Sequence, residues 1–216
     1  QPRQQERDAV KQRGALVAWA QCIATERPEA ARSVLTMDFR TDTYRRELRE
    51  LSETRLSENC FRAMDREYRA MRTGGLPFAG ALAETLIERD NQPILPRLAQ
   101  AALRPMPEPR SASDRIAMCM ALGAPQQVAE LFDTAPATAE EDAAVAALRP
   151  AAAICSQNGP ALEANALGLR SMLATASYRL VTEEGRGQCL KTIARPRPGL
   201  RSSCPEAAPF AVILDA

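Results

Sequence analysis

Two stretches of the chain, CIATERPEAARSVL from Cys22 and CMALGAPQQVAELF from Cys119, align without a gap. The offset of 97 residues places cysteine on cysteine, proline on proline and apolar residue on apolar residue. The matched pairs are Pro28 with Pro125, Val34 with Leu131, Leu35 with Phe132, Thr41 with Thr138, Leu48 with Val145 and Leu51 with Leu148. Internal symmetry over this length predicts two tandem copies of one structural unit.

Each copy carries the signals of four helices, of which the first and third would be tied by a disulfide. Residues 5–25 place apolar residues at helical spacing. The prolines of the two aligned stretches suit the first turn of a short second helix. Thr138, followed three residues later by Glu141, is a capping box that opens a third helix. A fourth, mostly apolar helix follows, where FAGALAETL from Phe78 aligns with LRSMLATAS from Leu169.

The composition also favours helices. Aromatic residues make up only 4% of the chain, so Ala, Leu, Val, Ile and Met must build the core, and these residues pack closely between helices. We expect an all-α fold with two tandem copies of a disulfide-tied helical repeat, plus a C-terminal disulfide loop with short β segments. The expected divisions are repeat 1 at 1–92, a Pro-rich linker at 93–110 with one short helix at Leu95–Ala102, repeat 2 at 111–182, and the loop and apolar tail at 183–216.

The chain has six cysteines, and their spacing predicts a disulfide framework. Two pairs are separated by 38 and 36 residues, and such similar separations favour one bridge used once in each copy. Two alternatives stay open: bridges that cross between the copies, and buried thiols that act as small hydrophobic side chains. The predicted bridges are Cys22–Cys60, Cys119–Cys155 and Cys189–Cys204.

Stable disulfides are typical of oxidising compartments. The sequence begins at Gln1 rather than at methionine, as a mature or a trimmed chain would. No apolar window reaches the length of about 20 residues that spans a bilayer as a helix. We therefore expect a periplasmic or extracellular protein whose signal peptide has been removed.

The C-terminal segment combines a basic stretch with an apolar end. No acidic residue occurs from 185 to 205, so this stretch could meet an anionic partner or form a soluble basic loop. The final PFAVILDA favours a β-strand that pairs with Tyr178–Thr182 or Leu190–Ala194, or that adds to another subunit. The candidate partner-binding residues are Arg186, Lys191, Arg195, Arg197, Arg201, Phe210, Val212, Ile213 and Leu214.

The sequence offers little catalytic chemistry. It contains no histidine, which excludes His-based nucleophilic pairs and imidazole metal sites, and it lacks the phosphate-binding and hydrolase motifs. Carboxylates alone could drive glycoside hydrolysis, with Asp65, Glu67 and Glu84 as candidates. The alternative for Asp65 and Glu67 is a solvated helix face, and for Glu84 an exposed position or a pair with Arg89. We expect no enzyme, and no catalytic, cofactor-binding or metal-binding residue.

The first-cysteine block with its proline, the T-x-x-E helix, the second cysteine and the F-x-x-A-L-A-E-x-L segment resemble a group of exported, uncharacterised two-repeat helical proteins of sphingomonad-type alphaproteobacteria. The resemblance covers most of residues 15–182. It implies a helical architecture and export, and the group has no known activity to carry over.

These features favour a non-catalytic exported interaction or structural protein, an accessory subunit of an envelope or membrane-associated assembly. The expected partner is another envelope protein or a membrane surface. A net charge of +1 and a basic stretch without aromatic residues argue against nucleic acid. The alternative is a protein that binds a small apolar ligand in a groove between the helical repeats.

Overall fold

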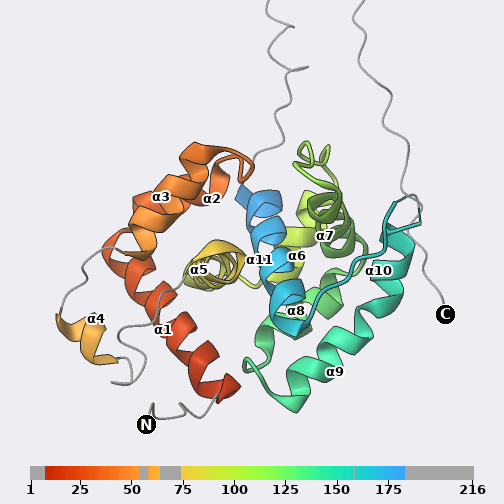
Figure 1. Cartoon of the computed structure of the whole chain (residues 1–216). Coiled ribbons are helices and arrows are strands. Elements are labelled where there is room, and N and C mark those ends of the chain that lie inside the picture. The colour runs from red at the N-terminus through yellow and green to blue at the C-terminus, as the bar shows by residue number, and fades with distance from the viewer. Residues whose placement is uncertain (1–7, 54–57, 64–73, 158, 183–216) are drawn as a thin grey trace, which may run out of the picture.

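A computed structural model describes residues 8–53, 58–63, 74–157 and 159–182 (Figure 1). These residues form eleven α-helices and contain no strand, which confirms the predicted all-α class. None of the described helices is both long and apolar enough to cross a membrane.

The helices fall into two halves joined by one short helix, α6 (Ile94–Ala101). The first half contains α1 (Ala9–Glu26), α2 (Pro28–Thr36), α3 (Asp42–Ser52), α4 (Glu58–Ala63) and α5 (Gly75–Arg89). The second half contains α7 (Ala112–Gly123), α8 (Pro125–Asp133), α9 (Ala139–Ala147), α10 (Arg149–Cys155) and α11 (Ala166–Thr182). Helix α6 lies within one residue of the short helix expected in the linker.

Local sequence explains where several helices begin. Helices α2 and α8 each start with a proline, which has the fixed φ of a first turn and no N–H to leave unpaired. The hydroxyl of Thr41 accepts the backbone N–H of Tyr44 and so caps α3. In the same way the hydroxyl of Thr138 accepts the N–H of Glu141 and caps α9.

Helices α5 and α11 form the centre of the molecule, with α1–α4 on one side and α7–α10 on the other (Figure 1). Their buried side chains include Phe78, Leu82 and Leu173, each with no exposed surface. The two helices approach each other closely at Gly80, where an added Cβ would stand 2.5 Å from Cα of Ser171. The absence of a side chain at Gly80 therefore allows this central contact.

Two disulfides form as the spacing predicted. Cys22–Cys60 joins α1 to α4, and Cys119–Cys155 joins α7 to α10, with Cα–Cα distances of 5.5 and 5.8 Å. The prediction that the third helix of each copy carries the second cysteine is wrong, because Cys60 and Cys155 lie on separate short helices, α4 and α10. In the second half, Pro150 stands in the first turn of α10, a position proline favours because it lacks an N–H.

One expectation for the C-terminal segment is also wrong. Tyr178–Thr182 belongs to α11, so the backbone of this segment is hydrogen-bonded within the helix and is not a strand to which PFAVILDA could pair. The Cys189–Cys204 bridge, the basic stretch and the apolar tail lie outside the described residues.

Candidate functional site

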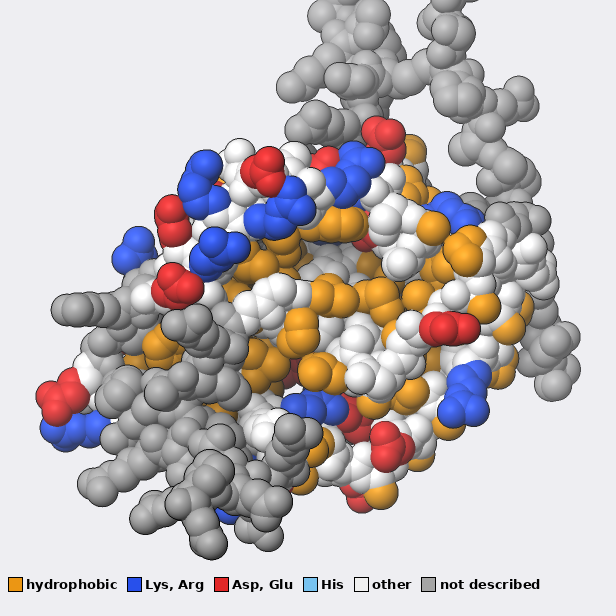
Figure 2. All heavy atoms as spheres, in the orientation of Figure 1, with side chains coloured by type: hydrophobic (Ala, Val, Ile, Leu, Met, Phe, Trp, Pro, Cys, Tyr) orange, Lys and Arg blue, Asp and Glu red, His pale blue; other side chains and the backbone are white. Residues whose placement is uncertain are grey.

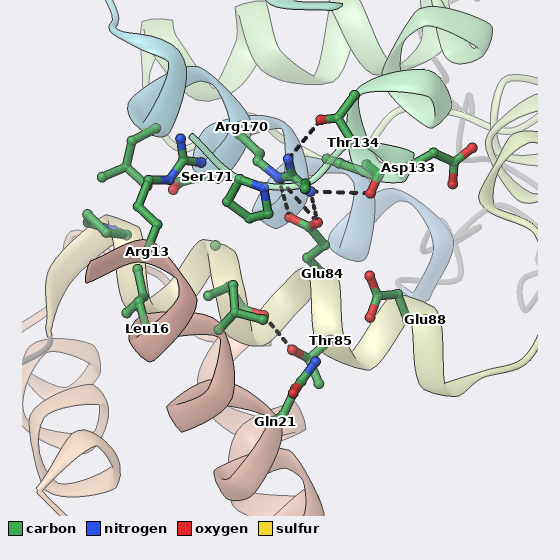
Figure 3. A pocket seen from close by; sticks show the side chains of 18 residues that line it. Arg13, Leu16, Gln21, Glu84, Thr85, Glu88, Asp133, Thr134, Arg170 and Ser171 are labelled. Atoms are coloured by element: carbon green, nitrogen blue, oxygen red, sulfur yellow. Dashed lines mark hydrogen bonds and ion pairs between the residues drawn. The ribbon is translucent and has the colours of Figure 1, made fainter. Parts of the chain in front are cut away.

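A buried arginine, Arg170 of α11, joins three parts of the fold (Figure 3). Its Nε lies 2.9 Å from Oε2 of Glu84 on α5, and its Nη2 also pairs with this carboxylate. Its Nη1 donates to Oε1 of Glu141 and to the hydroxyl of Thr134, both at 3.1 Å. Its Nη2 donates to the carbonyl of Phe132 at 3.2 Å. All five N–H donors of the guanidinium are thus used within the protein.

Glu141, in the first turn of α9, has no exposed surface and forms the second centre of this network. It pairs with both terminal nitrogens of Arg13 on α1, at 2.6 Å from Nη2, and accepts the N–H of Ala137 at 2.9 Å. Burial by itself raises the pKa of this carboxyl, but the hydrogen bonds from Arg13, Ala137 and Arg170 outweigh it and hold the pKa below its ordinary value. Glu141 is therefore a buried carboxylate that links α1, α9 and α11.

A pocket of about 320 Å³ lies beside this network, where α1 and α5 meet the α8–α9 corner and the start of α11 (Figure 3). It is bordered by both halves of the chain. Charged or polar side chains at its wall include Arg13, Glu84 and Arg170, which belong to the network. Its apolar lining consists of Leu16, Val17, Pro77, Ala81, Phe132, Ala135, Pro136 and Leu167.

Two exposed acids, Glu88 of α5 and Asp133 of α8, also line this pocket. Neither forms an ion pair with another residue that the structure describes. Partial removal from water raises the pKa of Glu88, and the nearby charges of Glu84 and Asp133 raise it further, against the opposing effect of Arg170. Burial and the two neighbouring carboxylates together thus outweigh the arginine.

The other end of α11 carries a second buried ion pair. Arg179 lies 2.7 Å from Asp114 of α7, with both side chains more than nine-tenths buried. Arg179 also donates to the carbonyl of Glu108 at 3.2 Å. Arg110 donates its backbone N–H to Asp114 at 2.8 Å, and its guanidinium donates to the carbonyl of Met37 at 2.6 Å, beyond the end of α2. This cluster attaches the segment after α6 to both halves of the molecule.

A second hollow, of about 510 Å³, lies between α9, α10 and the segment that precedes α11. Its lining is mostly aliphatic and includes Val145, Leu162 and Leu169.

Figure 2 shows apolar side chains gathered across the middle of one face, whereas charged side chains line the edge formed by α2 and α3. The exposed charges on α3 include an ion pair between Arg45 and Asp42, so this edge is a solvated surface.

The structure revises the sequence-based candidates. Glu84 is neither an exposed residue nor a partner of Arg89, because it pairs with Arg170, whereas Arg89 donates to the hydroxyl of Thr25 at 2.7 Å. Asp65 and Glu67 lie outside the described residues, as do the nine candidate partner-binding residues of the C-terminal segment.

Sequence reasoning missed Arg13 and Arg170, and it assigned Glu141 to capping alone. One signal was available: Arg170 and Glu84 each interrupt an otherwise apolar helix, and a charge on a buried helix face needs a partner. The partner could not be identified, because Arg170 and Glu84 are 86 positions apart in the chain.

Within the described residues, no group of three or more acidic, cysteine or histidine side chains is arranged to hold a metal ion. Comparison with known proteins finds no similar family model, no similar curated protein and no similar solved structure.

Proposed function

We propose that this chain is a non-catalytic exported protein built from two copies of one disulfide-tied helical unit, and that it binds a small molecule in the pocket between the copies. The observation that carries the proposal is the pocket itself. Its volume of about 320 Å³ lies within the range of small-molecule sites, and apolar side chains from both halves line it.

Several matched features support the duplication. Helices α2 and α8 each have nine residues, and the residues that precede them, Arg27 and Ala124, have nearly equal φ and ψ of −132° and 51° against −137° and 52°. Gly80 and Ser171, the contact point of the central helices, occupy equivalent positions when α5 is aligned with α11. An approximate two-fold axis that relates the copies would then pass near this contact.

A second match comes from arginines that reach between the halves. Arg13 and Arg110 correspond at the offset of 97 residues. Arg13 crosses to Glu141 at the start of α9, and Arg110 crosses to the carbonyls of Thr36 and Met37 at the end of α2. The matched arginines therefore both reach across the boundary between the halves, but their partners differ, because Glu141 aligns with Tyr44.

The charge network argues against catalysis by Glu84. Both oxygens of its carboxylate accept hydrogen bonds from Arg170, so this carboxylate is engaged in a structural ion pair and is not presented to a substrate. The ion pairs instead fix the helices that surround the pocket.

The two disulfides support a periplasmic or extracellular location.

The sequence also predicts an accessory subunit of an envelope assembly. The residues on which that role rests, the basic stretch and the apolar tail, lie outside the described residues, so it stays a prediction.

The proposal is tested by blocking the pocket. Fragments that bind the full chain are identified by ligand-observed NMR, and binding is repeated with Ala81→Phe, which places a ring in the pocket. Ala135→Trp is a second blocking variant at an exposed lining residue, and Ala143→Phe, at an exposed position on α9 outside the lining, is the control. Fragments should lose binding to folded blocking variants and keep it in the control. If no fragment is displaced by either blocking variant, the pocket is not the binding site.

A further inference from the structure

The charges that surround the pocket do not cancel. Arg13 and Arg170 are paired with Glu84 and Glu141 in one network, so two positive charges meet two negative ones. Arg170 has no N–H left for a ligand, because all five of its donors are used within the protein. Arg170 therefore has no donor to offer an anion, and the charge of Arg13 is already balanced by Glu141.

Two negative charges remain in excess. Glu88 and Asp133 line the pocket and form no ion pair with any residue in the described ranges. Both acids belong to the lining of one pocket, and burial together with the charges of Glu84 and Asp133 raises the pKa of Glu88. A positive charge held in the pocket would be attracted by both acids, and the apolar lining would contact the rest of the molecule that carries it.

The second half of the chain provides a comparison. When α5 is aligned with α11, Glu88 corresponds to Arg179, and at the offset of 97 residues Val17 corresponds to Asp114. Arg179 and Asp114 form a buried ion pair at 2.7 Å. At the corresponding place in the first half, Glu88 forms no ion pair with a residue that the structure describes, and the apolar Val17 lines an open pocket. The first half thus has an acid and a cavity where the second half has a closed ion pair.

On the basis of the proposed function, we infer that this pocket binds an organic cation, a molecule with an apolar body and one ammonium group. The apolar body would lie against Val17, Ala81 and Phe132, and the ammonium group would face Glu88 and Asp133. One pocket thus offers an apolar lining and two carboxylates, so its preference for a cation over a neutral molecule should depend on Glu88 and Asp133.

The test uses three probes with the same apolar body: 4-phenylbutylammonium, 4-phenylbutan-1-ol and 4-phenylbutanoate. Their affinities for the full chain are measured by NMR titration at low ionic strength. The ammonium probe should bind about fivefold more tightly than the alcohol, and the carboxylate probe most weakly. Added salt should weaken binding of the ammonium probe but not of the alcohol.

Variants separate the charge effect from the pocket. Glu88→Gln combined with Asp133→Asn should abolish the preference for the ammonium probe and leave the alcohol unchanged. The control Glu163→Gln, at an exposed glutamate that lines the second hollow and not this pocket, should alter neither. Equal affinities for the three probes, or a preference that survives the double variant, would overturn the cation assignment but not the pocket. Failure of all three probes to bind would overturn both.

Discussion

Gly80 of α5 faces Ser171 of α11 so closely that a Cβ on the glycine would stand 2.5 Å from both Cα and Cβ of the serine. Atoms at that distance cannot be accommodated by a side-chain rotation alone, because one of them belongs to the backbone. The separation of the two central helices is therefore set by the absence of a side chain at residue 80.

Gly80→Ala should lower the free energy of unfolding by about 1–3 kcal/mol, because the methyl group forces α5 and α11 apart. Gly14→Ala in α1 is the matched control, since a Cβ there meets no atom within 4 Å. The control should stabilise the protein by about 0.5–1 kcal/mol through helix propensity. Chemical denaturation measures the free energy of unfolding of both variants, and equal changes for the two substitutions would contradict the close contact.

Arg170→Met should destabilise the protein by about 3–5 kcal/mol, because it leaves the carboxylates of Glu84 and Glu141 buried without their shared cation. Arg45→Met provides a control at an exposed ion pair with Asp42, and it should cost less than about 1 kcal/mol. Urea unfolding of both variants tests the expectation. A loss at Arg170 no larger than at Arg45 would mean that the network contributes little to stability.

The stability of the wild-type protein should fall in acid partly through Glu141. Its pKa in the folded protein lies below the ordinary value of 4.5, so the folded state favours the ionised form. This contribution is fully present above about pH 4.5 and is lost as the pH falls through the lowered pKa.

Glu141→Gln should therefore lose part of the acid dependence of the unfolding free energy, although the variant is less stable at neutral pH. Glu163→Gln, which alters an exposed glutamate, should keep the wild-type dependence. Melting temperatures from pH 3 to pH 7 distinguish them, and identical pH profiles for all three proteins would argue against this role.

Removal of the Cys119–Cys155 bridge by substitution of both residues with alanine should lower the unfolding free energy by about 3–4 kcal/mol, as expected for closing a loop of 36 residues. Removal of Cys22–Cys60 should cost a similar amount, because its loop of 38 residues is nearly as long. Peptide mapping without reduction checks the pairing first, and a Cys22–Cys119 peptide would contradict it.

Features that depend on nearby residues could be predicted from the sequence. Pro28, Pro125, Thr41 and Thr138 mark helix starts because a proline ring and a capping hydroxyl act within one helical turn. The cysteine spacing identified both described disulfides, and the shortage of aromatic residues indicated helices. These properties need only the order of residues along the chain.

The tertiary structure alone decided which charges meet. Arg13 and Glu141 are 128 positions apart, and Arg170 and Glu84 are 86 apart, so no local pattern relates them. Their pairing follows from the crossing of α5 and α11 at Gly80, which brings α1 and the α8–α9 corner to the same place. The pocket exists for the same reason, because helices that are distant in sequence pack around it. The buried charges beside it are paired, since an unpaired buried charge is costly, whereas Glu88 and Asp133 are exposed and need no ion-pair partner within the described residues.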